Sequence, residues 1–181
     1  MSTAVLISIQ PKWCEMIAKG KKTIEIRKTR PKLETPFKCY IYCTLSGSNE
    51  FFRETLGGDV AAWNRSRMAE KKGMVIGEFV CDEISRYASV GIRREKTSYR
   101  RYNGLTFSSE ISYPAIGLTE TELAEYGGGK TIFGWHISKL IIYKEPRELG
   151  KYTGLHKTKF GFAPHQLQRP PQSWGYMEEV N

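Results

Sequence analysis

The stretch GKKTIEIR occupies residues 20–27 and decides how the rest of the chain is interpreted. Its two isoleucines alternate with polar residues, which is the period of a strand with one buried face. The isoleucines are expected to face a core, so Glu25 and Arg27 share the opposite face. With Lys22 close by, this pair suits a strand whose charged side chains contact a ligand in a neighbouring cleft. A strand whose charged face forms salt bridges in solvent would show the same pattern.

A strand and a helix are predicted directly before this stretch. Residues 4–9 (AVLISI) are apolar enough for a buried strand. Pro11 suits the first turn of a helix, where its missing N–H costs little. Gly20 is a favourable residue at which to end that helix. The helix presents apolar residues at the spacing i, i+3 and i+4, namely Trp13, Met16 and Ile17.

Later strands are predicted from runs of branched and aromatic residues. They are expected at residues 37–44, 73–84 (bent at Gly77), 130–143 and 173–178. Residues 85–117 are rich in Arg, Tyr and Ser, and we interpret them as an insertion or a long loop. The segment from Lys151 to the last of these strands is expected to be irregular.

Two further helices are predicted. One lies around residues 61–63, after a turn at Gly57–Gly58. The other covers residues 119–126, with Thr119 as the N-cap ahead of Glu122. Strands interrupted by short helices, without regular βαβ alternation, favour an α+β fold built on a small β-barrel. The length fits a single domain over residues 1–181.

Composition limits the class of protein and of partner. The formal net charge is +9 at pH 7, which favours a polyanion such as RNA, with DNA or a phosphate-bearing ligand as alternatives. Four cysteines in 181 residues, with no signal-peptide pattern, do not suggest a disulfide scaffold. No apolar run is long enough for a membrane span. The expectation is a soluble cytoplasmic protein with reduced thiols and no membrane partner.

Several common chemistries are not indicated. Residues 127–131 read GGGKT, but a phosphate-binding P-loop needs a glycine where Ala124 stands, and it should follow a strand. Cys39 and Cys43 lie four apart on a predicted strand, too far apart to clamp one ion. The three histidines have no ligand spacing. We therefore expect no metal and no cofactor.

The run PKWCEMIAKGKKTIEIRK resembles the start of the ASCH domain, a PUA-like family. That family carries the pattern G-x-K-x-x-E-x-R, which this chain supplies as Gly20, Lys22, Glu25 and Arg27. The later runs GMVIGEFVCDEI, TIFGWHISKLIIY and PPQSWGYMEE are similar to the rest of such a domain, and the last is similar to members from bacterial and phage genomes. The resemblance does not cover residues 85–117. It implies a PUA-like open β-barrel with short helices packed on its sides.

The resemblance also implies a basic cleft beside these ionic residues that holds RNA or a modified base. The four motif residues would then bind the ligand, and aromatic residues near the motif could stack on it. The available aromatics are Trp13, Tyr42 and Trp135, although each also suits a core. Arginines that alternate with tyrosines in the 85–117 segment could hold a nucleic-acid backbone or be ordinary surface residues. They are Arg93, Arg94, Arg100 and Arg101.

Whether the protein is an enzyme is left open. One ASCH-like branch resembles an amidohydrolase that removes an acyl group from N4-acetylcytidine, using a lysine and a threonine in a GxKTxTxR-like stretch. Lys22 matches that lysine, but Glu25 stands where the threonine should be, and a carboxylate does not replace a hydroxyl nucleophile. A hydrolase or nuclease with Lys22 as electrostatic stabiliser and Glu25 as base is the alternative to a binding module. A third interpretation is an accessory protein with a vestigial cleft.

Overall fold

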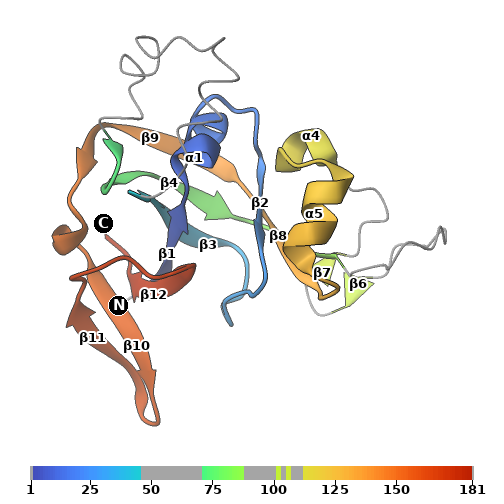
Figure 1. Cartoon of the computed structure of the whole chain (residues 1–181). Helices are drawn as coiled ribbons and strands as arrows, with labels where there is room; N and C mark the ends of the chain where they lie inside the picture. Colours follow the sequence, from blue (N-terminus) through green and yellow to red (C-terminus); the bar gives the residue numbers. More distant parts are fainter. Residues whose placement is uncertain (1, 46–70, 88–100, 103–104, 107–111, 181) are drawn as a thin grey trace.

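Two β-sheets pack against each other, and two of the short helices lie beside the smaller sheet (Figure 1). The computed structural model describes residues 2–45, 71–87, 101–102, 105–106 and 112–180. The larger sheet has seven strands in the order β11-β10-β12-β1-β3-β4-β9, and the smaller has five in the order β2-β8-β5-β7-β6. The strands of the larger sheet are β1 (Thr3–Ile9), β3 (Phe37–Cys43), β4 (Val75–Cys81), β9 (Ser138–Arg147), β10 (Thr153–Thr158), β11 (Gly161–Gln166) and β12 (Trp174–Glu178). Those of the smaller sheet are β2 (Ile24–Arg27), β5 (Ile84–Tyr87), β6 (Arg101–Tyr102), β7 (Leu105–Thr106) and β8 (Ile132–His136).

The described helices are short. Helix α1 (Pro11–Ala18) starts at a proline as expected, and Gly20 with φ of +68° follows its end. Helices α4 (Tyr113–Ile116) and α5 (Glu120–Gly127) lie beside β2, and a 3₁₀ turn, η2, covers Leu149–Lys151. None of the helices in the described ranges is long and apolar enough to span a membrane.

The main core lies between the two sheets. Its apolar side chains come from β1, β3 and β4 of the larger sheet, from β5 and β8 of the smaller one, and from α1. A second cluster lies on the other face of the larger sheet and contains Tyr40, Tyr42 and Tyr152. A third packs Ile26 of β2 against Ile116 and Leu123 of the two helices beside it. The four cysteines are buried free thiols.

The mixed fold of mostly strands with few helices is confirmed, whereas a barrel is not. Within the described residues the sheets stay open, and β11 and β9 are the edges of the larger one. Residues 85–87 continue β5 and residues 113–116 form α4, so these parts of the expected loop are regular structure. Strands β6 and β7 and residues 112 and 117 are the other described parts of this segment. The rest of residues 85–117 and the helix expected around residues 61–63 lie outside the described residues.

Two strand predictions are wrong. Residues 130–143 were expected to form one strand, but the chain leaves the smaller sheet after β8 and enters the larger one as β9. The change of sheet occurs at buried Ile137, whose N–H donates to the Thr23 carbonyl at 2.9 Å, and Lys139 has φ of +47°. The segment expected to be irregular after Lys151 contains the antiparallel hairpin β10–β11. A continuous run of branched and aromatic residues conceals a change of sheet, because it predicts strand in both parts and does not show which sheet each part joins.

Helix α5 begins with the predicted capping box. The Glu122 N–H donates to Thr119 Oγ1 at 3.3 Å, and the Thr119 N–H donates to Glu122 Oε2 at 2.8 Å. We expect Thr119→Ala to lower the free energy of unfolding by about 1 kcal/mol, because the Glu122 N–H in the first helical turn loses its side-chain acceptor. Urea denaturation measures this loss. Thr121→Ala, two positions further on and exposed, is the control, and equal losses in both variants would contradict the role of the cap.

Candidate functional site

Among the described residues, the buried charged side chains are Lys22, Glu25 and Arg27, with residue exposures of 3%, 5% and 9%. The strand period that placed Ile26 in a core therefore placed Glu25 and Arg27 together on the other face, as predicted. That face is not turned to solvent, so the interpretation as an exposed salt-bridged strand is wrong. Strand β2 lies between α4 and α5 on one side and the main core on the other (Figure 1).

Glu25 lies between the two cations. Its Oε1 is 2.9 Å from Arg27 Nη2, and its Oε2 is 3.4 Å from Lys22 Nζ. Burying charges is costly unless they are paired, so each of the three ions depends on the others. Glu25 and Arg27 lie on β2, and Lys22 lies two positions before that strand. The backbone therefore fixes the positions of all three charged residues.

Lys22 also connects two elements. Its Nζ donates to the Ile24 carbonyl at 2.8 Å and to the Ile116 carbonyl at the end of α4. The ammonium lies 5.2 Å from the centroid of the Trp13 ring, within cation–π range. Burial lowers the pKa of Lys22, and the Glu25 carboxylate opposes part of that change.

Arg27 anchors the cluster to β1 and to the start of β12. Its Nη2 donates to the Ser8 carbonyl at 2.7 Å, and its Nη1 lies 3.5 Å from Ser173 Oγ. Two polar atoms of the cluster are buried and have no hydrogen-bond partner, namely Glu25 Oε2 and Arg27 Nε. Such atoms are rare in native structures, and at a functional site they indicate a place for a ligand or a water.

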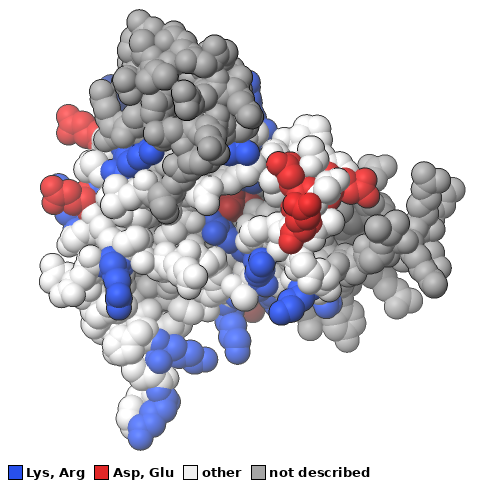
Figure 2. Space-filling model, viewed as in Figure 1, with Lys and Arg blue, Asp and Glu red and all other residues white. Residues whose placement is uncertain are grey.

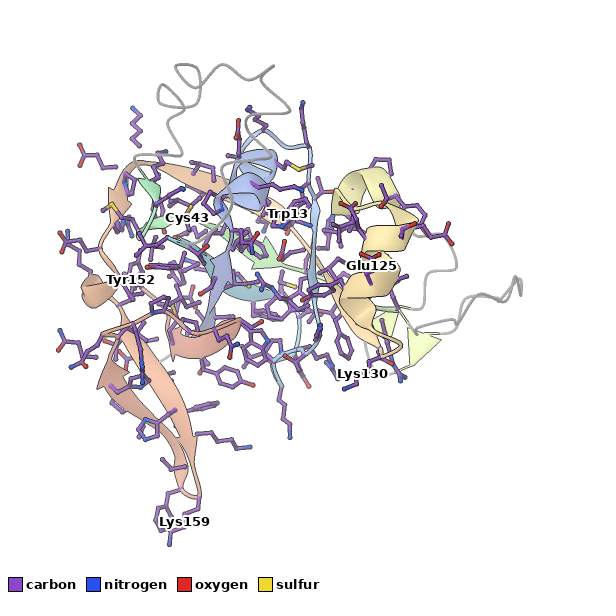
Figure 3. All side chains as sticks on the ribbon, viewed as in Figure 1. Trp13, Cys43, Glu125, Lys130, Tyr152 and Lys159 are labelled. Atoms are coloured by element: carbon purple, nitrogen blue, oxygen red, sulfur yellow. The ribbon has the colours of Figure 1, made fainter. Side chains whose placement is uncertain are left out.

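A cleft of about 480 Å³ opens beside these residues, and all three buried ions line it. Trp13 of α1 and Glu125 of α5 lie on the two sides of β2 (Figure 3). The lining contains the two buried cations and three carboxylates, of Glu25, Glu122 and Glu125. In Figure 2 acidic side chains gather over α4 and α5, at the right of the cleft. Among the described residues the lining mixes cations and carboxylates, so the basic character expected of the cleft is not confirmed.

The model of the family named "ASCH domain" matches residues 7–114, which include the whole Gly20–Arg27 motif. The chain belongs to the ASCH domain family. ASCH domains have a PUA-like fold and are generally linked to RNA binding. No curated protein matches the chain.

Solved ASCH structures share the fold of this ASCH domain. The crystal structure of a ZmASCH mutant protein from Zymomonas mobilis, with one serine replaced by alanine, aligns with a TM-score of 0.53 at 16% identity, covering 97% of this chain and 89% of that one. The crystal structure of ASCH from the same organism aligns with a TM-score of 0.50, also at 16% identity, covering 97% and 88%. At this identity the likeness concerns the fold alone.

Gly20, the glycine of the ASCH motif, belongs to the turn that follows α1. The N–H groups of Lys21 and Lys22 both donate to the Met16 carbonyl, at 2.9 and 3.1 Å. This tight turn brings Lys22 back under the helix and beside Trp13. Gly20 itself does not line the cleft.

Of the three aromatic residues expected beside the ligand, one lines the cleft and two are buried in cores. Trp13 is half-buried and lines the cleft. Trp135 is fully buried in the main core opposite Glu25 on β8, and Tyr42 is buried in the second cluster on the far face of the larger sheet. Neither of these two reaches the cleft, because core packing encloses them. The aromatic that sequence reasoning missed is Tyr126 of α5, which lines the cleft and follows a correctly predicted helix.

Of the predicted backbone arginines, Arg93, Arg94 and Arg100 lie outside the described residues, and Arg101 lies in the short strand β6. Their contact with a nucleic-acid backbone stays a prediction.

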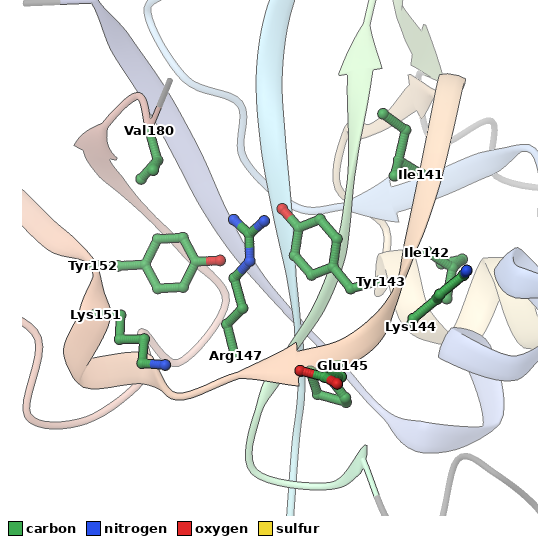
Figure 4. Close-up of a pocket in the computed structure, with 10 residues that line it drawn as sticks. Ile141, Ile142, Tyr143, Lys144, Glu145, Arg147, Lys151, Tyr152 and Val180 are labelled. Atoms are coloured by element: carbon green, nitrogen blue, oxygen red, sulfur yellow. The ribbon is translucent and has the colours of Figure 1, made fainter.

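A second hollow, of about 770 Å³, lies along β9 and η2 (Figure 4). There the Arg147 guanidinium lies 4.1 Å from the centroid of the Tyr143 ring, and Tyr152 approaches from the opposite side. Lys144, Arg147 and Lys151 are exposed. Because the described buried ions all line the cleft at β2 instead, that cleft is the stronger candidate for specific recognition.

Proposed function

We propose that the cleft binds one nucleobase of RNA, unmodified or modified, with its hydrogen-bonding edge toward Glu25 and Arg27. The observation that carries this proposal is the Glu25 Oε2 atom, a buried carboxylate oxygen of a cleft residue that has an ion pair with Lys22 Nζ at 3.4 Å but no hydrogen-bond donor. An unsatisfied buried acceptor costs free energy that a ligand donor would recover.

A base with an exocyclic amino group matches this acceptor. Cytosine offers an amino donor to a carboxylate, and its ring nitrogen beside that group accepts a hydrogen bond, which Arg27 Nε could donate. Uracil presents a carbonyl oxygen in place of the amino group and an N–H in place of the ring acceptor, so an acceptor would face the carboxylate and a donor would face Arg27 Nε. The mixed charge of the lining favours a base edge over a bare phosphate.

The cleft also suits a flat ring in size and shape. Its volume of about 480 Å³ lies within the range of small-molecule sites. Trp13 and Tyr126 supply aromatic surface from α1 and α5, and stacking on such rings is the common way in which proteins hold an unpaired base.

The test is calorimetric titration of the intact protein with cytidine and with uridine. We expect cytidine to bind at least about fivefold more tightly, since a mismatched donor–acceptor pair costs at least about 1 kcal/mol. Glu25→Gln should reduce this preference, because an amide can either donate or accept. Deoxycytidine in the same titration separates RNA from DNA as the source of the base.

Glu125→Gln is the matched control, because it makes the same chemical change at an exposed residue of the same cleft. It should leave the preference for cytidine intact. Equal binding of cytidine and uridine by the unaltered protein, or no saturable binding of either, would overturn the proposal.

A hydrolase in the same cleft is the second candidate, favoured by the lowered pKa of Lys22. Against a nucleophilic lysine stand its two hydrogen bonds to main-chain carbonyls, which hold the ammonium in place. Incubation with N4-acetylcytidine distinguishes the two functions: deacylation that disappears in Lys22→Ala supports the enzyme, and saturable binding of intact substrate supports the binding module.

A further inference from the structure

Strands β10 and β11 form an arm that extends away from the body of the molecule, with Lys159 at its tip (Figures 1 and 3). The two strands pair with each other over six residues each, whereas β10 pairs with β12 only at Gly154 and Leu155. The outer part of the hairpin is therefore held by its own ladder and exposes most of its side chains.

The arm has charge of a single sign. Residues 149–177 contain no aspartate or glutamate, although the whole chain has 19 acidic residues among 181. The same segment has four Lys and Arg residues, of which Lys157 and Lys159 are exposed on the arm. A protruding hairpin with cations and without carboxylates attracts polyanions.

Exposed aromatic rings accompany these cations. Phe160 at the tip is 89% exposed, and Phe162 on β11 is 42% exposed. The Lys159 ammonium lies 4.9 Å from the centroid of the Phe160 ring. One exposed ring is ordinary on a protein surface, but here the rings continue as a series toward the body of the molecule.

The series runs along one face of the larger sheet. Ring centroids are 4.8 Å apart between Phe162 and Tyr176, and 5.4 Å apart between Tyr176 and Trp174. Lys157 is directly opposite Phe162, so its side chain shares that face. Trp174 is opposite Ile7 of the main core, so its ring lies on the face of the larger sheet that packs against the smaller sheet.

The loop between β2 and β3 joins the ring series to the cleft. Its Lys32 N–H donates to the Tyr176 hydroxyl at 2.8 Å, and Trp174 Nε1 donates to Thr29 Oγ1 at 2.9 Å. Lys28, at the start of this loop, lies 5.1 Å from the centroid of the Tyr126 ring, which lines the cleft.

Exposed cations thus continue from the arm to the cleft. The loop contributes three of them, namely Lys28, Arg30 and Lys32. Figure 2 shows Lys and Arg side chains on the arm and, on the same face, between the arm and α5.

We propose that single-stranded RNA several nucleotides long follows this path, with its phosphates on the lysines and its bases on Phe160 and Phe162, while one base enters the cleft. This rests on the proposed function of the cleft and names its substrate as a strand rather than a free nucleoside. Lysines neutralise phosphates, and unpaired bases stack on exposed rings. The bases of a duplex are already stacked on each other and cannot stack on Phe160, so this ring favours a single strand over a duplex.

Fluorescence titration of the full chain with a single-stranded RNA of about ten nucleotides tests the path, because sites of this kind span about 4–16 nucleotides. Lys157→Ala with Lys159→Ala should weaken binding of the strand at least about tenfold and reduce the slope of log affinity against log salt by about 1.4, or about 0.7 for each lost phosphate contact. Binding of cytidine should be unchanged. Phe160→Leu should weaken binding of the strand and Phe160→Tyr should restore it.

The matched control is Lys144→Ala with Lys151→Ala, which removes two exposed lysines at the second hollow. It should leave both the affinity and the salt slope near those of the unaltered protein. Loss of affinity equal to that of the arm variant would overturn the path, as would equal affinity for a duplex or for polyglutamate.

The two proposals fail in different ways. If the arm variants bind the strand normally while Glu25→Gln still alters the preference for cytidine, the path is wrong and the cleft stands. If cytidine does not bind but binding of the strand depends on the arm, the cleft is wrong and the arm alone is the RNA-binding surface.

Discussion

Replacing Trp135 with alanine is expected to lower the free energy of unfolding by about 3–5 kcal/mol, the usual cost of truncating a buried tryptophan. Trp135 is fully buried. Its ring lies 6.0 Å from that of Phe37 in an edge-on arrangement and 5.8 Å from that of Trp174, centroid to centroid. It fills the space between the two sheets, so its loss leaves a cavity that neither sheet can close. Urea denaturation followed by circular dichroism measures the change.

Trp135→Phe is the control for this prediction. The indole Nε1 is buried and has no hydrogen-bond partner, so its removal costs no hydrogen bond. The phenylalanine variant should therefore be clearly more stable than the alanine variant and should bind cytidine normally. A loss below about 1 kcal/mol in Trp135→Ala would show that the sheets do not depend on this side chain.

Glu25→Ala is expected to cost a similar amount, about 3–5 kcal/mol, because it leaves Lys22 and Arg27 buried without their carboxylate. Both cations are almost enclosed, so water would solvate them poorly once the carboxylate is lost. Glu125→Ala removes an exposed carboxylate of the same cleft and should change stability by no more than about 0.5 kcal/mol. Equal effects of the two substitutions would contradict a buried ion cluster.

The pH dependence of the Glu25→Ala variant has a defined sign. Burial already lowers the pKa of Lys22 below the ordinary value of 10.5, and the substitution removes the carboxylate that raises it. Between the lowered pKa and 10.5 the unfolded chain binds a proton that the folded chain does not, so stability rises with pH. The difference in free energy of unfolding between the unaltered protein and the variant should be smaller at about pH 10 than at about pH 7. A difference that is constant or grows with pH would contradict the burial of Lys22.

The sequence was sufficient where a local pattern decides the outcome. The alternation around Ile26 placed Glu25 and Arg27 on one face, and the pairing of Thr119 with Glu122 identified the start of α5. Each of these depends on neighbours within four residues along the chain. The motif of the ASCH family added the expectation of a cleft beside them.

Features that depend on distant contacts could not be predicted in this way. The break at Ile137 depends on a hydrogen bond to Thr23, and Tyr126 reaches the cleft only because α5 packs beside β2. The mixed lining of the cleft could not be predicted from net charge, because net charge describes the whole chain, whereas two glutamates of α5 line this cleft. The hairpin β10–β11 was missed because its exposed strands show no buried face.

The contacts of Lys22 also bear on synthesis of the protein. Its ammonium is held by the carbonyl of Ile116, 94 positions later in the chain, and Gln172 completes the wall of the same cleft. A ribosome must therefore translate as far as Gln172 before this cleft is complete, so a nascent chain that ends earlier lacks one wall of it.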